Sequence, residues 1–148
     1  MRLPCLLLLG VMLGLVLSGC RDSVDRRGIV MNNERLADLA GKMRLTFPPG
    51  MRVLGVRETV GFDNAVFLKI EFGNEQWDRF LAASPMRDEE FSDERRYLLG
   101  ANEDWWDPGR PQELPTAQTY LPQGKVLNMG VDRGDPAKAV IYLMWHET

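Results

Sequence analysis

The spacing of apolar side chains changes along the chain, and each change marks a different kind of element. From residue 33 to residue 44 the apolar positions recur every three or four residues, which is the period of an amphipathic helix. Asn32 or Asn33 can cap this helix, and Glu34 in its first turn suits the helix dipole. The prolines and glycine of residues 48–50 then break the chain. The apolar positions of the predicted helix are Leu36, Leu39, Ala40 and Met43.

Five segments are instead candidate β-strands. In the clearest of them, residues 65–72, the apolar side chains fall on one face, and Lys69 and Glu71 fall on the other. The short connection before it, which contains Gly61 and Asn64, predicts an antiparallel hairpin. The last segment is apolar on both faces, as expected of a central strand. The predicted strands are 51–58, 65–72, 117–121, 125–132 and 139–146, the last two joined as a hairpin.

Helical spacing returns between the second and third predicted strands. We expect a helix over residues 75–84 with Asn74 as its cap, and a shorter helix over residues 93–99 with Ser92 as its cap. Residues 100–116 have no period, and a connection of this length in a compact domain is usually functional or mobile. The order of elements predicts an α+β domain, a mainly antiparallel sheet of about five strands with two or three helices packed on one face.

The N-terminal residues follow none of these patterns. Arg2 is followed by an almost wholly apolar run over residues 3–16 and then by Leu17-Ser18-Gly19-Cys20. A basic start, an apolar run and small residues at its end are typical of a secretory signal peptide. The alternative is an uncleaved membrane helix, although a spanning helix needs about 20 apolar residues and this run is short.

The sequence Leu17-Ser18-Gly19-Cys20 resembles the lipobox of bacterial lipoproteins. In that family the cysteine receives a diacylglycerol on its thiolate, the chain is cut just before it, and the new amine is acylated. The resemblance implies a signal peptide over 1–19 and a lipid anchor on Cys20, with two or three acyl chains for stable attachment to the bilayer. Arg21 does not match the aspartate that retains such proteins in the inner membrane, which favours the outer membrane, facing the periplasm.

The part of the chain after the predicted cleavage site divides in two. Residues 20–30 are mostly polar and charged, too poor in apolar side chains to fold alone, and we interpret them as a lipidated tether. Residues 31–148 form the single α+β domain. The overall pattern of this domain, which ends in Val140-Ile141-Tyr142-Leu143-Met144-Trp145-His146, resembles small bacterial lipoproteins of uncharacterised function, a likeness that brings no activity and no site residues.

Cleavage would leave 129 residues with 17 basic and 21 acidic side chains, a net charge of −4. Mild acidity argues against nucleic acid as a partner. Cys5 would leave with the signal peptide and Cys20 would carry lipid, so no thiol would remain for a disulfide and the core alone would hold the fold.

The residues that usually carry catalysis are few. His146 is the one histidine, and it lies at the end of a predicted strand, so we favour a structural role over that of a general base or metal ligand. Without a second histidine or a free cysteine, the usual zinc site is excluded, and no Gly-x-Ser-x-Gly elbow or glycine-rich phosphate loop is present. The sequence therefore predicts no catalytic residue, no metal and no cofactor.

Carboxylates are plentiful, and they could hold calcium or cleave a glycan as a pair. The first group is interleaved with arginines and lacks the spacing and glycine of a calcium loop, which favours a self-paired, solvated surface. The two groups are Asp88, Glu89, Glu90, Asp93 and Glu94, and then Glu103, Asp104 and Asp107.

The most suggestive segment is the tryptophan pair in the long connection. Trp105 and Trp106 cannot point the same way in an extended chain, so one is expected to pack onto the domain and the other to face a partner or stack on a sugar or peptide. The alternative is that both cover the core. The predicted contacts are Trp105, Trp106 and Asp107, with Arg110 as a polar neighbour.

Three interpretations of function follow from these patterns. The leading one is a non-enzymatic lipoprotein of the cell envelope that binds an envelope protein or a cell-wall ligand. The second is an immunity lipoprotein that neutralises a toxin delivered to the periplasm. The third is an envelope hydrolase that uses the acidic residues Glu103, Asp104 and Asp107.

Overall fold

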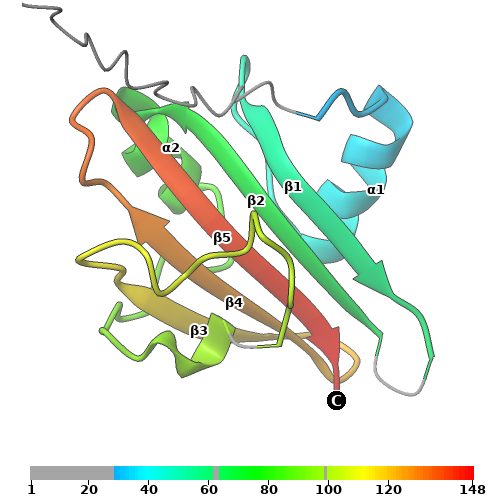
Figure 1. The fold of residues 1–148 in the computed structure, drawn as a ribbon. Coiled ribbons are helices and arrows are strands. Elements are labelled where there is room, and N and C mark those ends of the chain that lie inside the picture. The colour runs from blue at the N-terminus through cyan, green and yellow to red at the C-terminus, as the bar shows by residue number, and fades with distance from the viewer. Residues whose placement is uncertain (1–28, 62–63, 99) are drawn as a thin grey trace, which may run out of the picture.

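The computed structural model describes residues 29–61, 64–98 and 100–148. The predicted signal peptide, Cys20 and Arg21 lie outside the described residues. The described chain forms one antiparallel sheet in the order β1-β2-β5-β4-β3 (Figure 1). The strands are β1 (Arg52–Thr59), β2 (Ala65–Gly73), β3 (Thr116–Leu121), β4 (Lys125–Asp132) and β5 (Lys138–Glu147).

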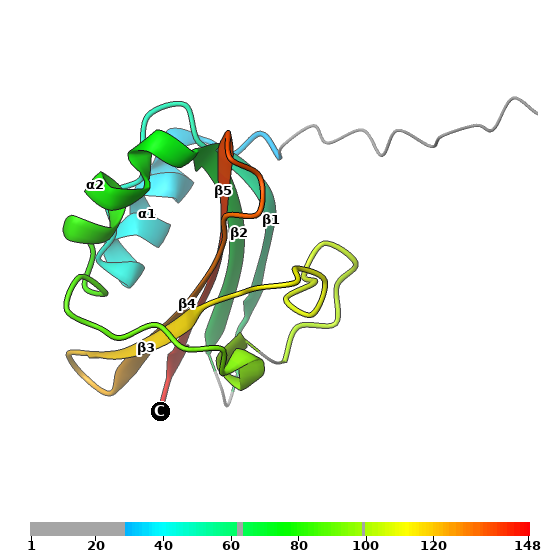
Figure 2. The same cartoon turned by 90° about the vertical axis from the view of Figure 1, so that its left-hand side faces the viewer.

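Two helices cover one face of this sheet. They are α1 (Asn33–Met43) and α2 (Trp77–Ala82), the latter preceded by a 3-10 turn, η1 (Asn74–Gln76). Figure 2 shows both helices on the same side of the sheet, with the long connection on the other side. The α+β prediction, with five antiparallel strands and helices on one face, is therefore confirmed.

The main core lies between the sheet and the two helices, and strand alternation builds it. Every second side chain of β2 and of β5 points toward the helices, because successive residues of a strand face opposite sides. The β2 and β5 side chains of this core are Val66, Leu68, Ile70 and Phe72, and Ala139, Ile141, Leu143 and Trp145. β5 is the central strand, as its apolar pattern predicts.

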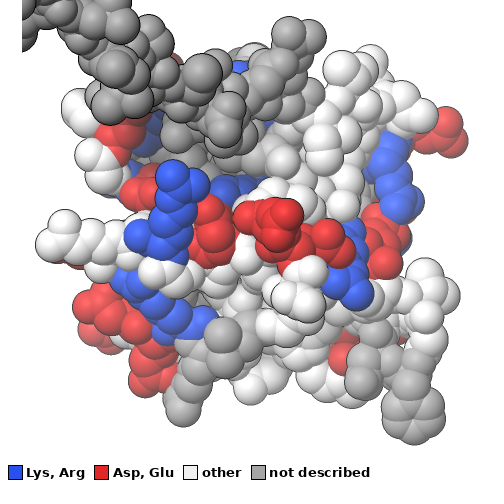
Figure 3. Space-filling view, viewed as in Figure 1, with Lys and Arg blue, Asp and Glu red and all other residues white. Residues whose placement is uncertain are grey.

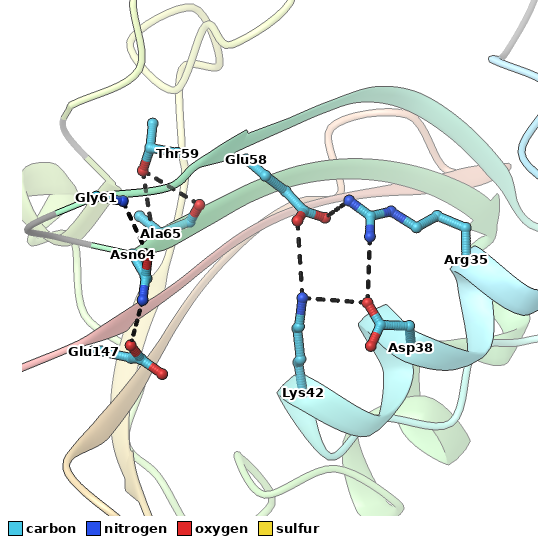
Figure 4. Close-up of polar contacts among 9 residues, drawn as sticks. All are labelled: Arg35, Asp38, Lys42, Glu58, Thr59, Gly61, Asn64, Ala65 and Glu147. Atoms are coloured by element: carbon cyan, nitrogen blue, oxygen red, sulfur yellow. Dashed lines mark hydrogen bonds and ion pairs between the residues drawn. The ribbon is translucent and has the colours of Figure 1, made fainter.

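α1 is capped and ion-paired to the edge of the sheet (Figure 4). The Asn32 side chain accepts a hydrogen bond from the Arg35 amide at 2.8 Å, which satisfies a free donor of the first turn. Glu58 of β1 pairs with Arg35, and its other oxygen lies 3.8 Å from the Lys42 ammonium. Asp38 bridges the same two cations along the helix. These contacts join α1 to the edge strand β1.

Residues near the β1–β2 connection also tie the two strands to β5. The Thr59 hydroxyl accepts a hydrogen bond from the Ala65 amide at 3.2 Å (Figure 4). The Asn64 side chain accepts from the Gly61 amide and donates to Glu147 at 2.7 Å. The end of β5 is therefore held against this turn.

Three local expectations differ from the structure. Asn74 lies inside η1 rather than capping α2, because its side chain instead accepts from Arg133 and donates to the Pro136 carbonyl. Ser92 pairs through its backbone with Thr116 and does not cap a helix. The predicted helix over 93–99 is a 3-10 turn, η2 (Arg95–Leu98), and it packs beside β3, β4 and β5 with the long connection.

Ile29, which lies in the segment interpreted as a tether, already contacts the sheet. Its amide donates to the Val53 carbonyl at 2.7 Å. Among the described residues, no helix is long and apolar enough to span a bilayer.

Candidate functional site

The face of the sheet opposite the helices is covered by the connection that carries the tryptophan pair. Trp106 is buried beneath this connection, only 6% exposed. Its indole N–H donates to the Leu98 carbonyl at 2.8 Å. Its ring meets the rings of Phe67 and Tyr142 edge-on, with centroids 5.3 and 5.5 Å away. A second, smaller apolar core forms around it. Trp106 is thus a structural anchor, as one member of the pair was expected to be.

Trp105 lies on the surface side of that anchor. Its ring is half-buried and meets the Trp106 ring edge-on, with centroids 5.7 Å apart. It rests directly on the backbone of Gly55 in β1, where a Cβ atom would overlap the indole ring. The pairing of β1 with β2 is irregular between Val53 and Gly55. Gly55 therefore provides the seat that lets the tryptophan approach the strand.

Asp107 fastens the connection to the sheet through two side chains. Its carboxylate accepts from the Lys69 ammonium at 2.5 Å and from the Tyr142 hydroxyl at 2.8 Å. Lys69 also donates to the Trp105 carbonyl at 3.0 Å. Arg110, which is largely exposed, lies 3.6 Å from the second carboxylate oxygen.

These contacts change how Asp107 and Tyr142 titrate. Burial alone would raise the pKa of Asp107, but the hydrogen bonds from Lys69 and Tyr142 and the charge of Lys69 outweigh burial and lower it. Burial, and then the adjacent Asp107 carboxylate, raise the pKa of Tyr142 well above its ordinary value. At neutral pH the site therefore holds an ionised aspartate beside a neutral phenol.

A third fastening comes from η2. The Arg95 guanidinium donates to the backbone carbonyls of Pro108 and Gly109 at 3.4 Å and of Gln112 at 2.7 Å. The connection is thus held at Trp106, at Asp107 and along residues 108–112. Such a segment loses little conformational entropy when a partner binds it.

Charged side chains lie on the same face of the sheet as the tryptophan. Arg57 and Glu103 form an ion pair at 3.1 Å, with both side chains more than a third exposed. Glu71, which is buried, pairs with Arg52 at 2.6 Å and with Lys138 at 3.4 Å. Figure 3 shows acidic and basic side chains side by side in a band across this face. The arrangement is an aromatic side chain within a rim of mixed charge.

The structure brings all four predicted contacts, Trp105, Trp106, Asp107 and Arg110, onto one face. It places Trp106 in the interior, so the surface consists of Trp105, Arg110 and the ion-paired rim. Sequence reasoning missed the groups that hold them, which are Gly55, Lys69, Arg95 and Tyr142. Only Lys69 gave a signal, as a charge on the polar face of a well-defined strand.

The other candidate residues do not converge with these. His146 lies at the end of β5, where a ring nitrogen is 3.4 Å from the Glu147 carbonyl oxygen. Asp88 pairs with its neighbour Arg87 on an exposed turn. Among the described residues, no three histidine, cysteine or acidic side chains are grouped as a metal site would require.

Fold and site together define a small α+β domain in which a fastened connection displays an aromatic surface on the sheet face opposite the helices. No protein-family model, curated protein or solved structure matches the chain.

Proposed function

We propose that this chain is a lipid-anchored protein of the cell envelope whose domain binds a partner protein through the sheet face opposite its helices. The observation that carries the proposal is the arrangement around Trp105, a half-buried aromatic ring on a prearranged connection, with exposed ion pairs at its edge. An aromatic centre with a polar rim is the usual anatomy of a protein interface.

The contacts of the acidic side chains support binding over catalysis. Asp107 is engaged by Lys69 and Tyr142, and Glu103 by Arg57. A carboxylate already committed to a lysine and a phenol is poorly placed to take a proton from substrate. Both acids instead hold or border the tryptophan surface.

The anchor rests on the lipobox resemblance of Leu17-Ser18-Gly19-Cys20, and one substitution tests it. In cells grown with radiolabelled palmitate, the wild-type protein should carry label and sediment with membranes, in the outer-membrane fraction. Cys20→Ser should lose the label, because the thiolate is the group that accepts the lipid. Equal labelling of both proteins would refute the proposed anchor.

In-cell photo-crosslinking tests the binding face. A photoreactive residue would replace Arg110, whose side chain is 77% exposed, in the full-length chain. Ultraviolet light followed by mass spectrometry should yield one dominant protein adduct. A toxin delivered to the periplasm as that adduct would make this an immunity protein, and a resident envelope protein would make it an assembly partner.

The matched control places the same photoreactive residue at Arg79, an exposed position of α2 on the helix side of the sheet. The proposal expects no specific adduct there. An equal yield of the same adduct at Arg79, or no protein adduct at Arg110, would count against the proposed face.

A further inference from the structure

An apolar groove lies at the edge of the sheet, between α1, residues 45–53 and the residues that directly precede α1. Its volume is about 650 Å³. The Ile29 amide holds one wall in place, since it donates to the Val53 carbonyl at 2.7 Å. The groove is on the helix side of the sheet, because four partly buried side chains that pack against the main core also line it. These are Met31, Leu36, Phe47 and Met51.

The lining of this groove favours an uncharged, apolar occupant. Two of its residues are large apolar side chains with high exposure, Ile29 at 46% and Val30 at 99%. Among the described residues, the only charged one in the lining is Arg52, and its guanidinium pairs with Glu71 at 2.6 Å. Exposed apolar surface of this kind marks a site that binds an apolar ligand or surface.

The chain itself brings such an occupant close. Cys20, the predicted lipidation site, precedes the Ile29 wall of the groove by nine residues. Nine residues span at most about 30 Å, so acyl chains on Cys20 would stay within reach of the groove. A ligand on so short a linker acts at an effective concentration on the order of mM. Residues 21–28 are themselves poorly suited to fill an apolar groove, because Val24 is their only large apolar side chain.

We propose that this groove binds one acyl chain of the lipid on Cys20 when the protein is outside a bilayer. The inference rests on the proposed lipid anchor and gives the anchor a site on the domain. In water, binding would remove apolar surface of both the acyl chain and the groove from solvent. In a bilayer, lipid tails already surround the acyl chain, so the groove would act only on protein that has left the membrane.

Intramolecular photo-crosslinking of the acylated protein tests the proposal. Cells expressing the full-length chain would be grown with a palmitate analogue that carries a diazirine within its chain and a terminal alkyne. The labelled protein would be bound to an affinity resin in neutral detergent, washed free of detergent while still bound, and irradiated. After trypsin digestion and capture through the alkyne, mass spectrometry identifies the peptides joined to the lipid. We expect them to be residues 36–42 of α1 and residues 45–52, which together supply most of the groove.

Two substitutions in the groove separate this site from general apolar contact. Ala37→Glu places a charge in the lining and should lower the yield of these two peptides about fivefold, because that charge would lose water beside an acyl chain. Ala40→Phe should have the same effect by filling the groove. The control is Ala82→Glu, at an exposed position of α2 outside the groove, which should leave the yield unchanged. Circular dichroism would check that each variant folds.

The outcomes distinguish the groove from the anchor. Labelled protein whose crosslinks are spread over the whole domain, or whose yield is unchanged in both groove variants, would overturn the groove and leave the anchor standing. Crosslinks that join two copies of the chain would overturn it in favour of a second copy as the occupant. Protein that takes up no label would overturn the anchor and the groove together.

Discussion

Replacement of Asp107 by alanine is expected to lower the free energy of unfolding by about 3 kcal/mol. The change leaves the Lys69 ammonium, whose side chain is 12% exposed, without its counterion, and it leaves the buried Tyr142 hydroxyl without its acceptor. Stranding a charge and a polar group in a poorly solvated place costs more than losing a surface pair. Urea unfolding at neutral pH measures the loss.

The same site predicts a dependence on pH. Because the pKa of Asp107 is lower in the folded protein than in the unfolded chain, its ionised form stabilises the fold at neutral pH. That contribution is complete above the unfolded pKa of about 3.9 and is lost as the pH falls through the lower folded value. The difference in stability between the wild type and Asp107→Asn should therefore shrink below about pH 4.

The matched control is Asp104→Ala, an exposed acid of the same connection. It should change stability by less than about 0.5 kcal/mol, as surface substitutions usually do. If Asp104→Ala lowered the free energy of unfolding as much as Asp107→Ala, the effect would come from removing a negative charge and not from the contacts with Lys69 and Tyr142.

Gly55→Ala is expected to displace Trp105 and loosen the connection over the sheet. The new Cβ would overlap the indole ring, and overpacking of this kind costs about 1–3 kcal/mol. Two amides of the connection report the change, that of Trp106, which donates to the Glu103 carbonyl, and that of Arg110, which donates to the Asp107 carbonyl. Hydrogen exchange should become faster at both while the main core remains protected.

Gly109→Ala is the matched control for this substitution. Gly109 lies in the same connection, and a Cβ there meets no atom within 4 Å. Exchange in this variant should match the wild type. If Gly55→Ala also left hydrogen exchange and the free energy of unfolding unchanged, the close packing of Trp105 on the β1 backbone would be refuted.

The sheet could be predicted because its strands and hairpins depend on residues that are close together in sequence. The alternation of Val66, Leu68, Ile70 and Phe72 fixes which face of β2 is buried beneath the helices, and the apolar pattern of β5 fixes its central place. Turn residues and short connections determine the hairpins. The cap of α1 followed from Asn32, whose side chain needs only the amide three residues ahead.

The site could be predicted only in part, because alternation gives the face of a side chain and not what covers it. The alternation predicts that Lys69 and Glu71 lie on the polar face, but it could not show that the connection that carries Asp107 covers Lys69. Lys69, one of the two side chains that bind Asp107, is 38 residues away from it in sequence. In the sequence, Gly55 is only a residue of low strand propensity. The structure shows that the Trp105 ring lies against its backbone, where a Cβ atom would not fit. The Asn74 side chain does not cap a helix, because it accepts a hydrogen bond from Arg133, a residue distant in sequence.

The most direct test of the central claim compares photo-crosslinking from position 110 in the wild type and in Trp105→Ala. Protein levels and thermal unfolding would be measured in parallel, so that loss of the fold is distinguished from loss of binding. We predict that the dominant protein adduct of the wild type disappears in a Trp105→Ala protein that still folds and accumulates. An adduct of unchanged identity and yield in that variant would contradict the assignment of Trp105 as the centre of the binding surface.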